Sequence, residues 1–238
     1  MDIERIFESY DNYINIYQHE LNKLDSNASN LLLNSLYLSV YTTFEYFLEN
    51  LIQSYVRSIT ESDKGIKLEG LKGSIAMKYF INTNKNSKKL EQLLKDPKTK
   101  TYDSIKSILY NKIDQEELSK YLRFEFLHDN KLKEHYPDIF AQIFNDSELL
   151  EHIELSTFET ISNVNQVQKY SAANFISKYR DIRNSIAHEN FHFSIENEQF
   201  VEYVSNFKYI ISEMIKKYES VNNFPITNSS NDLLKEFS

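Results

Sequence analysis

The sequence predicts an all-α protein, an up-down bundle with four long core helices and a helical insertion. Only three glycines and three prolines occur in 238 residues, whereas most β-rich folds need more turn residues. Apolar residues recur at three- and four-residue steps over long segments, which is the pattern of helices that bury one face. A hydrophobic content of 41% is enough for one sizeable domain, or for a core domain with an insertion.

The core helices follow from the apolar spacing. Between the first two, Asp25, Ser26 and Asn27 break the pattern and offer helix caps. Long helices with one apolar stripe usually bury it by packing against one another up and down. The core helices are expected at 3–24, 28–59, 166–188 and 196–218.

The stretch 62–164 is expected to be a helical insertion between the second and third core helices. A short helix is expected at 74–81, a helix at 102–127, and one or two shorter helices at 137–155. Six lysines between residues 82 and 100 would either contact RNA phosphates or form a solvated loop. Core and insertion together make one domain, 1–220, followed by a C-terminal tail, 221–238, that frays.

The composition excludes several classes of protein. Without cysteine there is no disulfide, no thiolate metal site and no cysteine nucleophile, and we see no His/Asp/Glu cluster at metal-ligand spacing. A net charge of −8 argues against a general nucleic-acid coat protein but allows a local cationic site. The N-terminus does not resemble a signal peptide, and the apolar run 31–56 contains Glu45 and Glu49, which favours a buried helix over a membrane span. We therefore expect a cytoplasmic protein with no cofactor and no membrane partner.

The most informative stretch is 180–188, which reads Arg-Asp-Ile-Arg-Asn-Ser-Ile-Ala-His. The chain has only five arginines and six histidines, yet two arginines and one histidine lie within these nine residues. The forked donors of arginine suit phosphate, and histidine can move a proton near neutral pH. The stretch therefore suggests binding or chemistry at a phosphodiester.

A helical wheel divides this segment into two faces. The apolar face consists of Phe175, Tyr179, Ile182 and Ile186. Arg180, Asn184 and His188 follow one another at four-residue steps on the polar face. Arg183 lies at the boundary, from which it can reach toward the bundle while Asn184 and His188 point outward into a cleft.

A carboxylate is expected within an apolar stripe of the second core helix. The stripe through Glu45 consists of Leu31, Leu38, Thr42, Ile52 and Val56. A buried carboxylate is costly unless it is paired, and Arg183 or Arg180 is the natural partner. The alternative is that Glu45 lies at the edge of the stripe and reaches water. Glu49 is a weaker candidate on the same side.

The spacing of Arg183 and His188 is weak evidence by itself. Arg123 and His128 reproduce it in the same chain. The later copy ends a clean amphipathic helix and has the small Ala187 before its histidine, whereas the earlier copy is packed with Phe and Leu. The context therefore favours the later copy.

Residues 183–188, Arg-Asn-Ser-Ile-Ala-His, resemble the Arg-x4–6-His signature of HEPN domains in its Arg-Asn-x-x-Ala-His form. The preceding segment 175–182 is similar to the helix that leads into that signature. The helix 37–55, with its Phe-Glu-Tyr-Phe-Leu run, resembles the early HEPN helix that carries an acidic residue. Within the superfamily the chain most resembles the RiboL-PSP and MAE types. The likeness covers about 28–60 and 166–218 and does not extend to the insertion.

The resemblance implies a HEPN-like four-helix core, a metal-independent endoribonuclease and a homodimer in which two motifs face one cleft. HEPN proteins often act as toxins of toxin–antitoxin or phage-defence systems, so RNA and an antitoxin protein are the expected partners. Some of them carry His-x-Tyr, whose tyrosine the antitoxin modifies. Here Glu189 and Asn190 follow His188, which does not fit that regulation.

Metal-free RNA cleavage needs a base for the 2′-OH proton, an acid for the leaving 5′-oxygen and a cation for the phosphorane. One His188 per chain cannot easily be base and acid at once, and a two-fold dimer supplies two. We expect Arg183 to stabilise the phosphate or to orient His188. Asn184 would hold phosphate or ribose, and Arg180 would add phosphate affinity. Glu45 would fix Arg183, and the products would carry 2′,3′-cyclic phosphates.

Two other functions stay open. A non-catalytic helical module would bind RNA, a nucleotide or a protein through the same cleft. A structural partner subunit would use its acidic surface and many tyrosines for protein contacts. His192 is a further candidate proton carrier, although its place between Phe191 and Phe193 is more typical of a packed turn.

Overall fold

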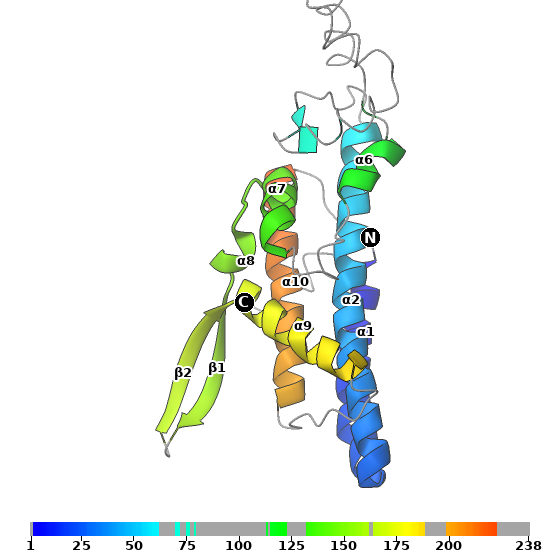
Figure 1. The fold of residues 1–238 in the computed structure, drawn as a ribbon, viewed down its shortest axis with the longest axis vertical. Coiled ribbons are helices and arrows are strands. Elements are labelled where there is room, and N and C mark those ends of the chain that lie inside the picture. The colour runs from blue at the N-terminus through cyan, green and yellow to red at the C-terminus, as the bar shows by residue number, and fades with distance from the viewer. Residues whose placement is uncertain are drawn as a thin grey trace, which may run out of the picture. The chain divides into compact units, whose positions relative to one another are not determined.

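Most of the chain that the structure describes is helical, which confirms the predicted all-α class (Figure 1). In this computed structural model the described residues are 2–61, 70–71, 75–76, 79, 113, 115–122, 132–161, 164–188 and 199–222. The chain divides into two compact units, residues 1–48 with 148–238 and residues 49–147. The earlier Arg–His pair at 123–128, the lysine-rich stretch and His192 lie outside the described residues.

The N-terminal helices begin where short acidic residues cap them. Helix α1 spans Ile3–Glu20, and helix α2 spans Ser26–Glu61. The short 3-10 helix η1, Leu21–Lys23, lies between them. The Asp2 carboxylate accepts a hydrogen bond of 3.2 Å from the Arg5 amide. The Asp25 carboxylate accepts bonds of 3.0 Å and 2.9 Å from the amides of Asn27 and Ala28. The cap predicted between the first two core helices is thus confirmed.

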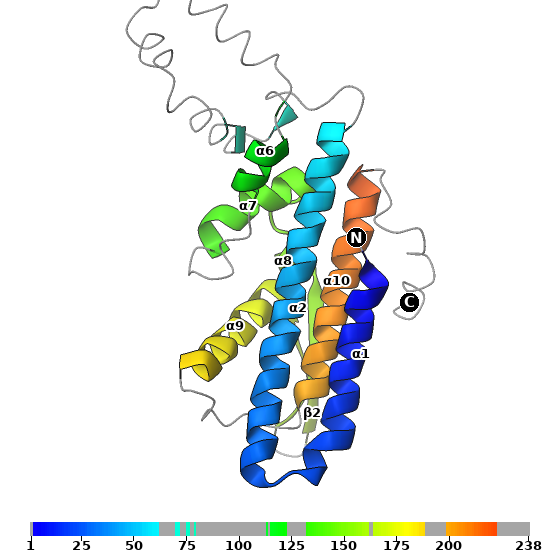
Figure 2. The same cartoon turned by 90° about the vertical axis from the view of Figure 1, so that its right-hand side faces the viewer.

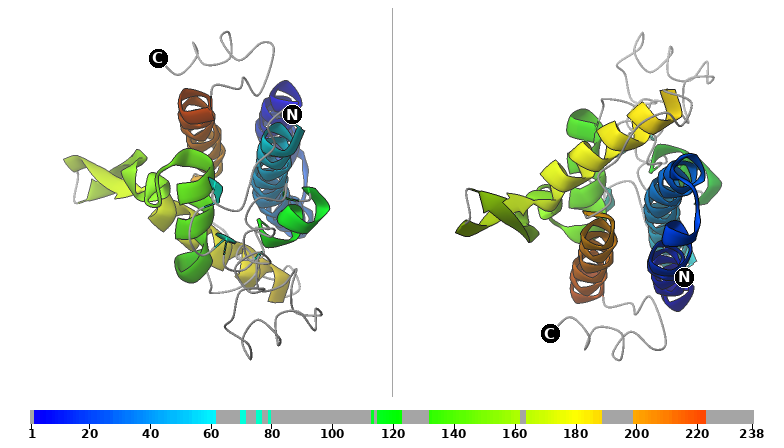
Figure 3. Two further views of the ribbon diagram at one scale, coloured as in Figure 1. Left: turned by 90° about the horizontal axis from the view of Figure 1, so that it is seen from above. Right: turned by 90° about the horizontal axis from the view of Figure 1, so that it is seen from below.

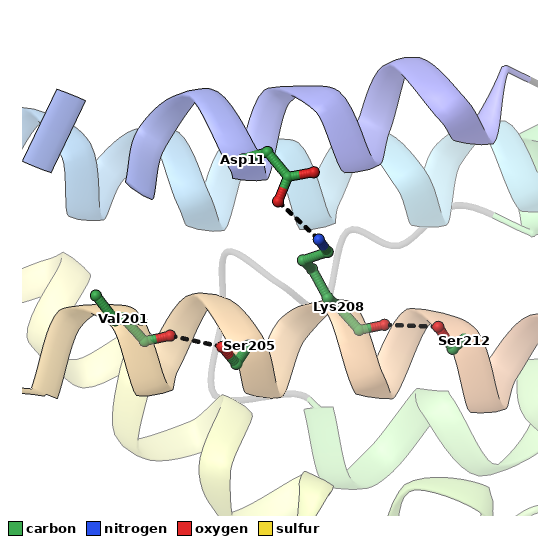
Figure 4. Close-up of polar contacts among 5 residues, drawn as sticks. All are labelled: Asp11, Val201, Ser205, Lys208 and Ser212. Carbon is green, nitrogen blue, oxygen red and sulfur yellow. Dashed lines mark hydrogen bonds and ion pairs between the residues drawn. The ribbon is translucent and has the colours of Figure 1, made fainter. Parts of the chain in front are cut away.

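Helix α10, Phe200–Asn222, lies alongside α1 in the first unit (Figure 2). Figure 4 shows the Lys208 ammonium donating a 2.7 Å bond to Asp11 of α1. The same ammonium lies 5.5 Å from the centre of the Phe7 ring, a distance suited to a cation–π contact. Along α10, the hydroxyls of Ser205 and Ser212 donate to carbonyls one turn earlier, so both serines are satisfied inside the helix.

A β-hairpin replaces the start of the third predicted core helix. Strands β1 and β2, Glu154–Ile161 and Val164–Ser171, pair antiparallel, with Glu154 opposite Ser171. The prediction of helix over 166–171 is therefore wrong, and α9 spans only Ala172–His188. The sequence has apolar residues at three-residue steps here, Val164, Val167 and Tyr170, and this spacing resembles that of a helix. The backbone of the segment instead forms its hydrogen bonds with β1. The hairpin also follows the short helix α8, Leu149–His152, which agrees with the one or two shorter helices expected over 137–155.

An aromatic core joins helices α1, α2, α9 and α10 within the first unit. Phe207 of α10 lies at its centre, with ring-to-ring distances of 4.9 Å to Tyr179 and 5.0 Å to Phe175 on α9. It also lies 5.1 Å from Phe44 on α2 and 6.5 Å from Tyr10 on α1. Aromatic pairs add roughly 0.5–1.5 kcal/mol each beyond the area they bury. Figure 3 shows that α9 crosses α2 and α10 obliquely instead of running parallel to them.

The second unit contains helices from the predicted insertion. Helices α6 and α7 span Gln115–Tyr121 and Leu132–Phe144. Asn145 follows with a φ of 52°, the left-handed conformation that often ends a helix. Inside this unit the Gln142 amide donates a 2.7 Å bond to the Tyr55 hydroxyl. The helix predicted over 102–127 is confirmed only at α6, because the described residues Ile113 and Leu122 are not helical. Helix α7 begins before the expected start at 137.

Candidate active site

Helix α9 carries the motif, and its first turn is tied to the preceding chain. The Ser171 hydroxyl accepts a 3.3 Å bond from the Asn174 amide, so the last residue of β2 caps α9. The Ala172 amide donates a 2.9 Å bond to the carbonyl of Ile153. The hairpin and α8 therefore set the direction in which α9 begins.

Tyr179 anchors the middle of α9 on α2. It is 1% exposed, and its hydroxyl donates a 3.2 Å bond to the backbone carbonyl of Tyr37. Its ring stacks at 5.3 Å on Tyr37 and at 6.0 Å on Tyr41. Burial raises the pKa of the Tyr179 hydroxyl well above its usual range, so this donor keeps its proton. Arg180 follows Tyr179 directly, and Arg183 lies one turn after Tyr179. The contacts of Tyr179 with α2 therefore position both arginines.

The two faces of α9 are visible in the burial of its side chains. Phe175, Tyr179 and Ile186 are buried, and Ile182 is half-buried. His188 is the last residue of α9 and is exposed. Its imidazole makes no hydrogen bond to any residue in the described part of the chain. The imidazole is thus accessible to a substrate or to a second chain.

Arg183 is turned toward the polar face by its neighbour. Its Nη1 donates a 3.1 Å hydrogen bond to Oδ1 of Asn184. Asn184 shares one face with His188, one turn later. With a rise of 1.5 Å per residue, Arg183 and His188 are separated by about 7.5 Å along the helix axis. A fixed cation and a titratable imidazole therefore lie on the last two turns of one helix.

Arg180 is more buried than its place on the polar face predicts. Its side chain is 13% exposed, and Nη2 lies 3.3 Å from a carboxylate oxygen of Asp181, which is 71% exposed. A long arginine stem can cover apolar surface while its charged head stays hydrogen-bonded, so a helical wheel does not report its burial. Asp181 is an acidic residue that any phosphate approaching Arg180 would meet.

Glu45 and both arginines act on one buried phenol. The Oε1 atom of Glu45 is buried, although the residue as a whole is half-buried. One turn earlier on α2, Tyr41 is completely buried. Burial raises the pKa of the Tyr41 hydroxyl, and the negative charge of Glu45 raises it further. The positive charges of Arg180 and Arg183 lower it, so the three charged side chains lie within electrostatic range of this hydroxyl. A direct ion pair between Glu45 and either arginine stays a prediction.

The apolar stripe predicted through Glu45 is confirmed only in part, since Ile52 and Val56 are buried and Leu38 is half-buried. Leu31 is 51% exposed and Thr42 is exposed, while Glu49 also faces solvent. Within the first unit the buried side chains of α2 are those of Leu33, Asn34, Leu36, Tyr37, Val40, Tyr41, Phe44, Phe47 and Leu48. Rings on α1, α9 and α10 all contact this face, which makes it wider than one stripe and shifts it around the helix. Glu45 therefore lies at the border of the buried face.

Two residues near the motif were not singled out from the sequence. Tyr41 precedes Glu45 by four residues, and that spacing was the available signal for a shared face. Asp181 lies inside the nine-residue stretch, where its basic neighbours are the stronger signal for phosphate. In the part of the chain that the structure describes, no three His, Asp or Glu side chains are grouped so that they could hold a metal ion.

Comparison with known proteins identifies a family for this chain. The family model described as RiboL-PSP-HEPN matches residues 3–220, a range that includes α1, α2, α9 and α10. No curated protein and no solved structure matches the sequence. Among the described residues, no helix is both long and apolar enough to cross a membrane.

Proposed function

The chain belongs to the RiboL-PSP-HEPN family, and from this premise we propose that it is an endoribonuclease that cleaves RNA without a metal ion. The HEPN family is generally associated with ribonucleases. The observation that carries the proposal is the Arg183–Asn184 bond of 3.1 Å on the helix that ends in the exposed His188. It supports the proposal because the bond turns a cation that can bind phosphate toward the helix face that carries His188, a residue type that can move a proton.

The proposed reaction is attack of the ribose 2′-oxygen on the adjacent phosphorus. His188 of one chain takes the 2′-OH proton, and the 5′-oxygen leaves with a proton from His188 of a second copy. Arg183 stabilises the charge of the phosphorane, and Asn184 holds phosphate or ribose. Arg180 adds phosphate affinity, and Glu45 fixes Arg183. The products carry a 2′,3′-cyclic phosphate and a 5′-hydroxyl.

A second copy of the chain is part of the proposal. One imidazole cannot hold and lack a proton in the same step, so acid and base must come from two groups. In a two-fold dimer the same surface of each chain meets its counterpart, which brings the two His188 residues to one cleft. Such a dimer would also supply contacts that orient the imidazole.

The biological role that fits this activity is that of a toxin in a toxin–antitoxin or phage-defence system. It would act on RNA in the cytoplasm and would be held in check by an antitoxin protein. Expression of the wild-type chain should then arrest growth, and His188→Ala should relieve the arrest. Arrest that persists unchanged with His188→Ala would contradict this role.

The direct test is cleavage of RNA by the purified protein in EDTA. His188→Ala should lower the rate by about 10²–10⁴, the usual worth of a general acid or base. His19→Ala is the matched control, because His19 is also an exposed histidine in the last turn of a helix and lies on α1. Full activity of folded His188→Ala protein, or dependence on a metal ion, would reject the mechanism.

A non-catalytic RNA-binding module is the second candidate. It is favoured by the lack of any hydrogen-bond partner for the His188 side chain among the described residues, since a catalytic base is commonly oriented by another group. Binding of an RNA with 2′-O-methyl groups, together with no cleavage of the same sequence as ordinary RNA, would support this module.

A further inference from the structure

Tyr41 presents a buried hydroxyl with an unusual hydrogen-bonding state. The residue is 0% exposed, and its ring stacks on Tyr179 with planes only 8° apart. Its hydroxyl makes no hydrogen bond within the described part of the chain. A buried hydroxyl without a partner lowers stability, and phenylalanine would fill the same space without that cost. The hydroxyl is therefore a candidate for a role other than packing.

Charged residues of the proposed site lie within one turn of Tyr41 on α2 and within one turn of its stacking partner on α9. Glu45 follows Tyr41 by one turn of α2 and has a buried carboxylate oxygen. The stacking partner Tyr179 is followed directly by Arg180 and, one turn later, by Arg183. Tyr41 thus shares α2 with this acidic residue and stacks on the residue that precedes the cationic turns of α9.

Building on the proposed function, we propose that Tyr41 is a positioning residue whose hydroxyl bridges Arg183 and Glu45 when RNA is bound. A phenol can accept one hydrogen bond and donate another, so it can accept from the guanidinium and donate to the carboxylate. Hydrogen bonds to charged partners are stronger than neutral ones. No proton is transferred, and the phenol stays neutral throughout.

The bridge requires Arg183 to change partner. In this structure Arg183 is bonded to Oδ1 of Asn184. When Arg183 turns to Tyr41, the Asn184 oxygen is released and can accept a hydrogen bond from a ribose hydroxyl, while the other guanidinium donors face the phosphate. The free chain thus keeps the Tyr41 hydroxyl unsatisfied, and RNA binding supplies its partners.

The test is Tyr41→Phe, which removes only the hydroxyl. Its unfolding temperature should equal or exceed that of the wild type, because an unsatisfied buried group is lost. Its affinity for RNA with 2′-O-methyl groups and its kcat/KM should both fall by roughly 10- to 100-fold, the worth of a hydrogen bond to a charged group. Tyr10→Phe is the matched control, because it breaks the 3.3 Å bond of a buried tyrosine to the Val40 carbonyl. It should be less stable than the wild type and bind and cleave RNA normally.

A positioning role also predicts non-additivity. Tyr41→Phe should have little further effect on RNA affinity when Glu45→Gln or Arg183→Lys is already present, because each change breaks the same bridge. A packing role would instead give independent effects and a loss of stability. Unchanged affinity and kcat/KM in Tyr41→Phe would overturn the inference.

Binding and cleavage of RNA by the wild type distinguish a failure of this inference from a failure of the proposed function. If the wild type binds RNA but does not cleave it, the nuclease proposal fails and the Tyr41 test still stands on affinity. If the wild type cleaves RNA and Tyr41→Phe does so equally well, only the Tyr41 inference fails. If the wild type neither binds nor cleaves RNA, both are overturned.

Discussion

The hydroxyl of Tyr179 on α9 donates a 3.2 Å hydrogen bond to the backbone carbonyl of Tyr37 on α2. This bond joins the helix that carries the motif to the helix that carries Glu45, one residue before Arg180. It is reinforced by the stacking of the two rings at 5.3 Å. The position of the cationic turns of α9 thus depends on a contact buried in the core.

Tyr179→Phe should lower the free energy of unfolding by about 1 kcal/mol, because one buried hydrogen bond is lost while the stacking remains. Tyr179→Ala should cost about 3–5 kcal/mol, since a large cavity forms beside Phe207. Urea unfolding of the three proteins measures both differences. Equal stability of Tyr179→Phe and wild type would show that the bond does not hold α9 on α2.

Asp181→Asn should increase RNA affinity severalfold, because Arg180 then loses the carboxylate that lies 3.3 Å away and competes with phosphate. The pair is largely exposed on the Asp181 side, so stability should change by less than about 0.5 kcal/mol. Asp11→Asn makes the same change in net charge on α1, beside Lys208. Titration of labelled RNA compares the affinities of the two variants. An equal gain in affinity in both would show that the effect comes from net charge alone.

Arg183→Lys should lower RNA cleavage by at least about 10-fold although the charge is kept, because an ammonium cannot use the planar fork of donors on two partners. Arg5→Lys serves as its control, since Arg5 is an exposed arginine on α1. Steady-state rates on one RNA substrate decide the comparison. Retained activity in Arg183→Lys would mean that only positive charge is needed at this position.

Mixing the wild type with His188→Ala tests the two-chain site. After free exchange of equal amounts, about a quarter of the dimers contain two wild-type chains. Activity per total protein should therefore fall to about a quarter of the wild-type value if both imidazoles are needed. A fall to about one half would mean that each chain cleaves on its own. Sedimentation of the same mixtures should show a dimer, and a stable monomer would contradict the composite site.

The protein should lose stability steeply in alkali. Burial raises the pKa of Tyr10, Tyr41 and Tyr179, whereas in the unfolded chain these phenols titrate near the ordinary value of about 10. The stability that these neutral, buried phenols give to the folded state is fully present below the unfolded-state pKa of about 10. It is lost as the pH rises from there toward the folded-state pKa values, because only the unfolded state releases the protons. Each phenol adds a slope of about 1.4 kcal/mol per pH unit.

Urea unfolding at several values above about pH 10 measures this slope. Tyr41→Phe should reduce it by the share of one phenol, because two raised tyrosines remain. A slope that is identical in wild type and Tyr41→Phe would show that this hydroxyl titrates alike in both states.

The sequence by itself determined the local features of the protein. The apolar spacing set the long helices α1, α2 and α10 to within a few residues, and Asp25 marked the cap of α2. Helical spacing also put Asn184 and His188 on one face, because that relation depends only on 3.6 residues per turn. These features are encoded within one or two turns of chain, so no distant contact was needed to predict them.

Only the tertiary structure decided the rest. The segment 164–171 has an apolar period of three and still forms a strand, because β1 provides a partner for its backbone. The border position of Glu45 follows from the helices that cover α2 on several sides, which no single stripe can represent. The charges of Arg180 and Arg183 act on the buried Tyr41 hydroxyl across more than 130 positions of sequence. Contacts of that separation depend on how helices pack, and packing is a property of the folded chain.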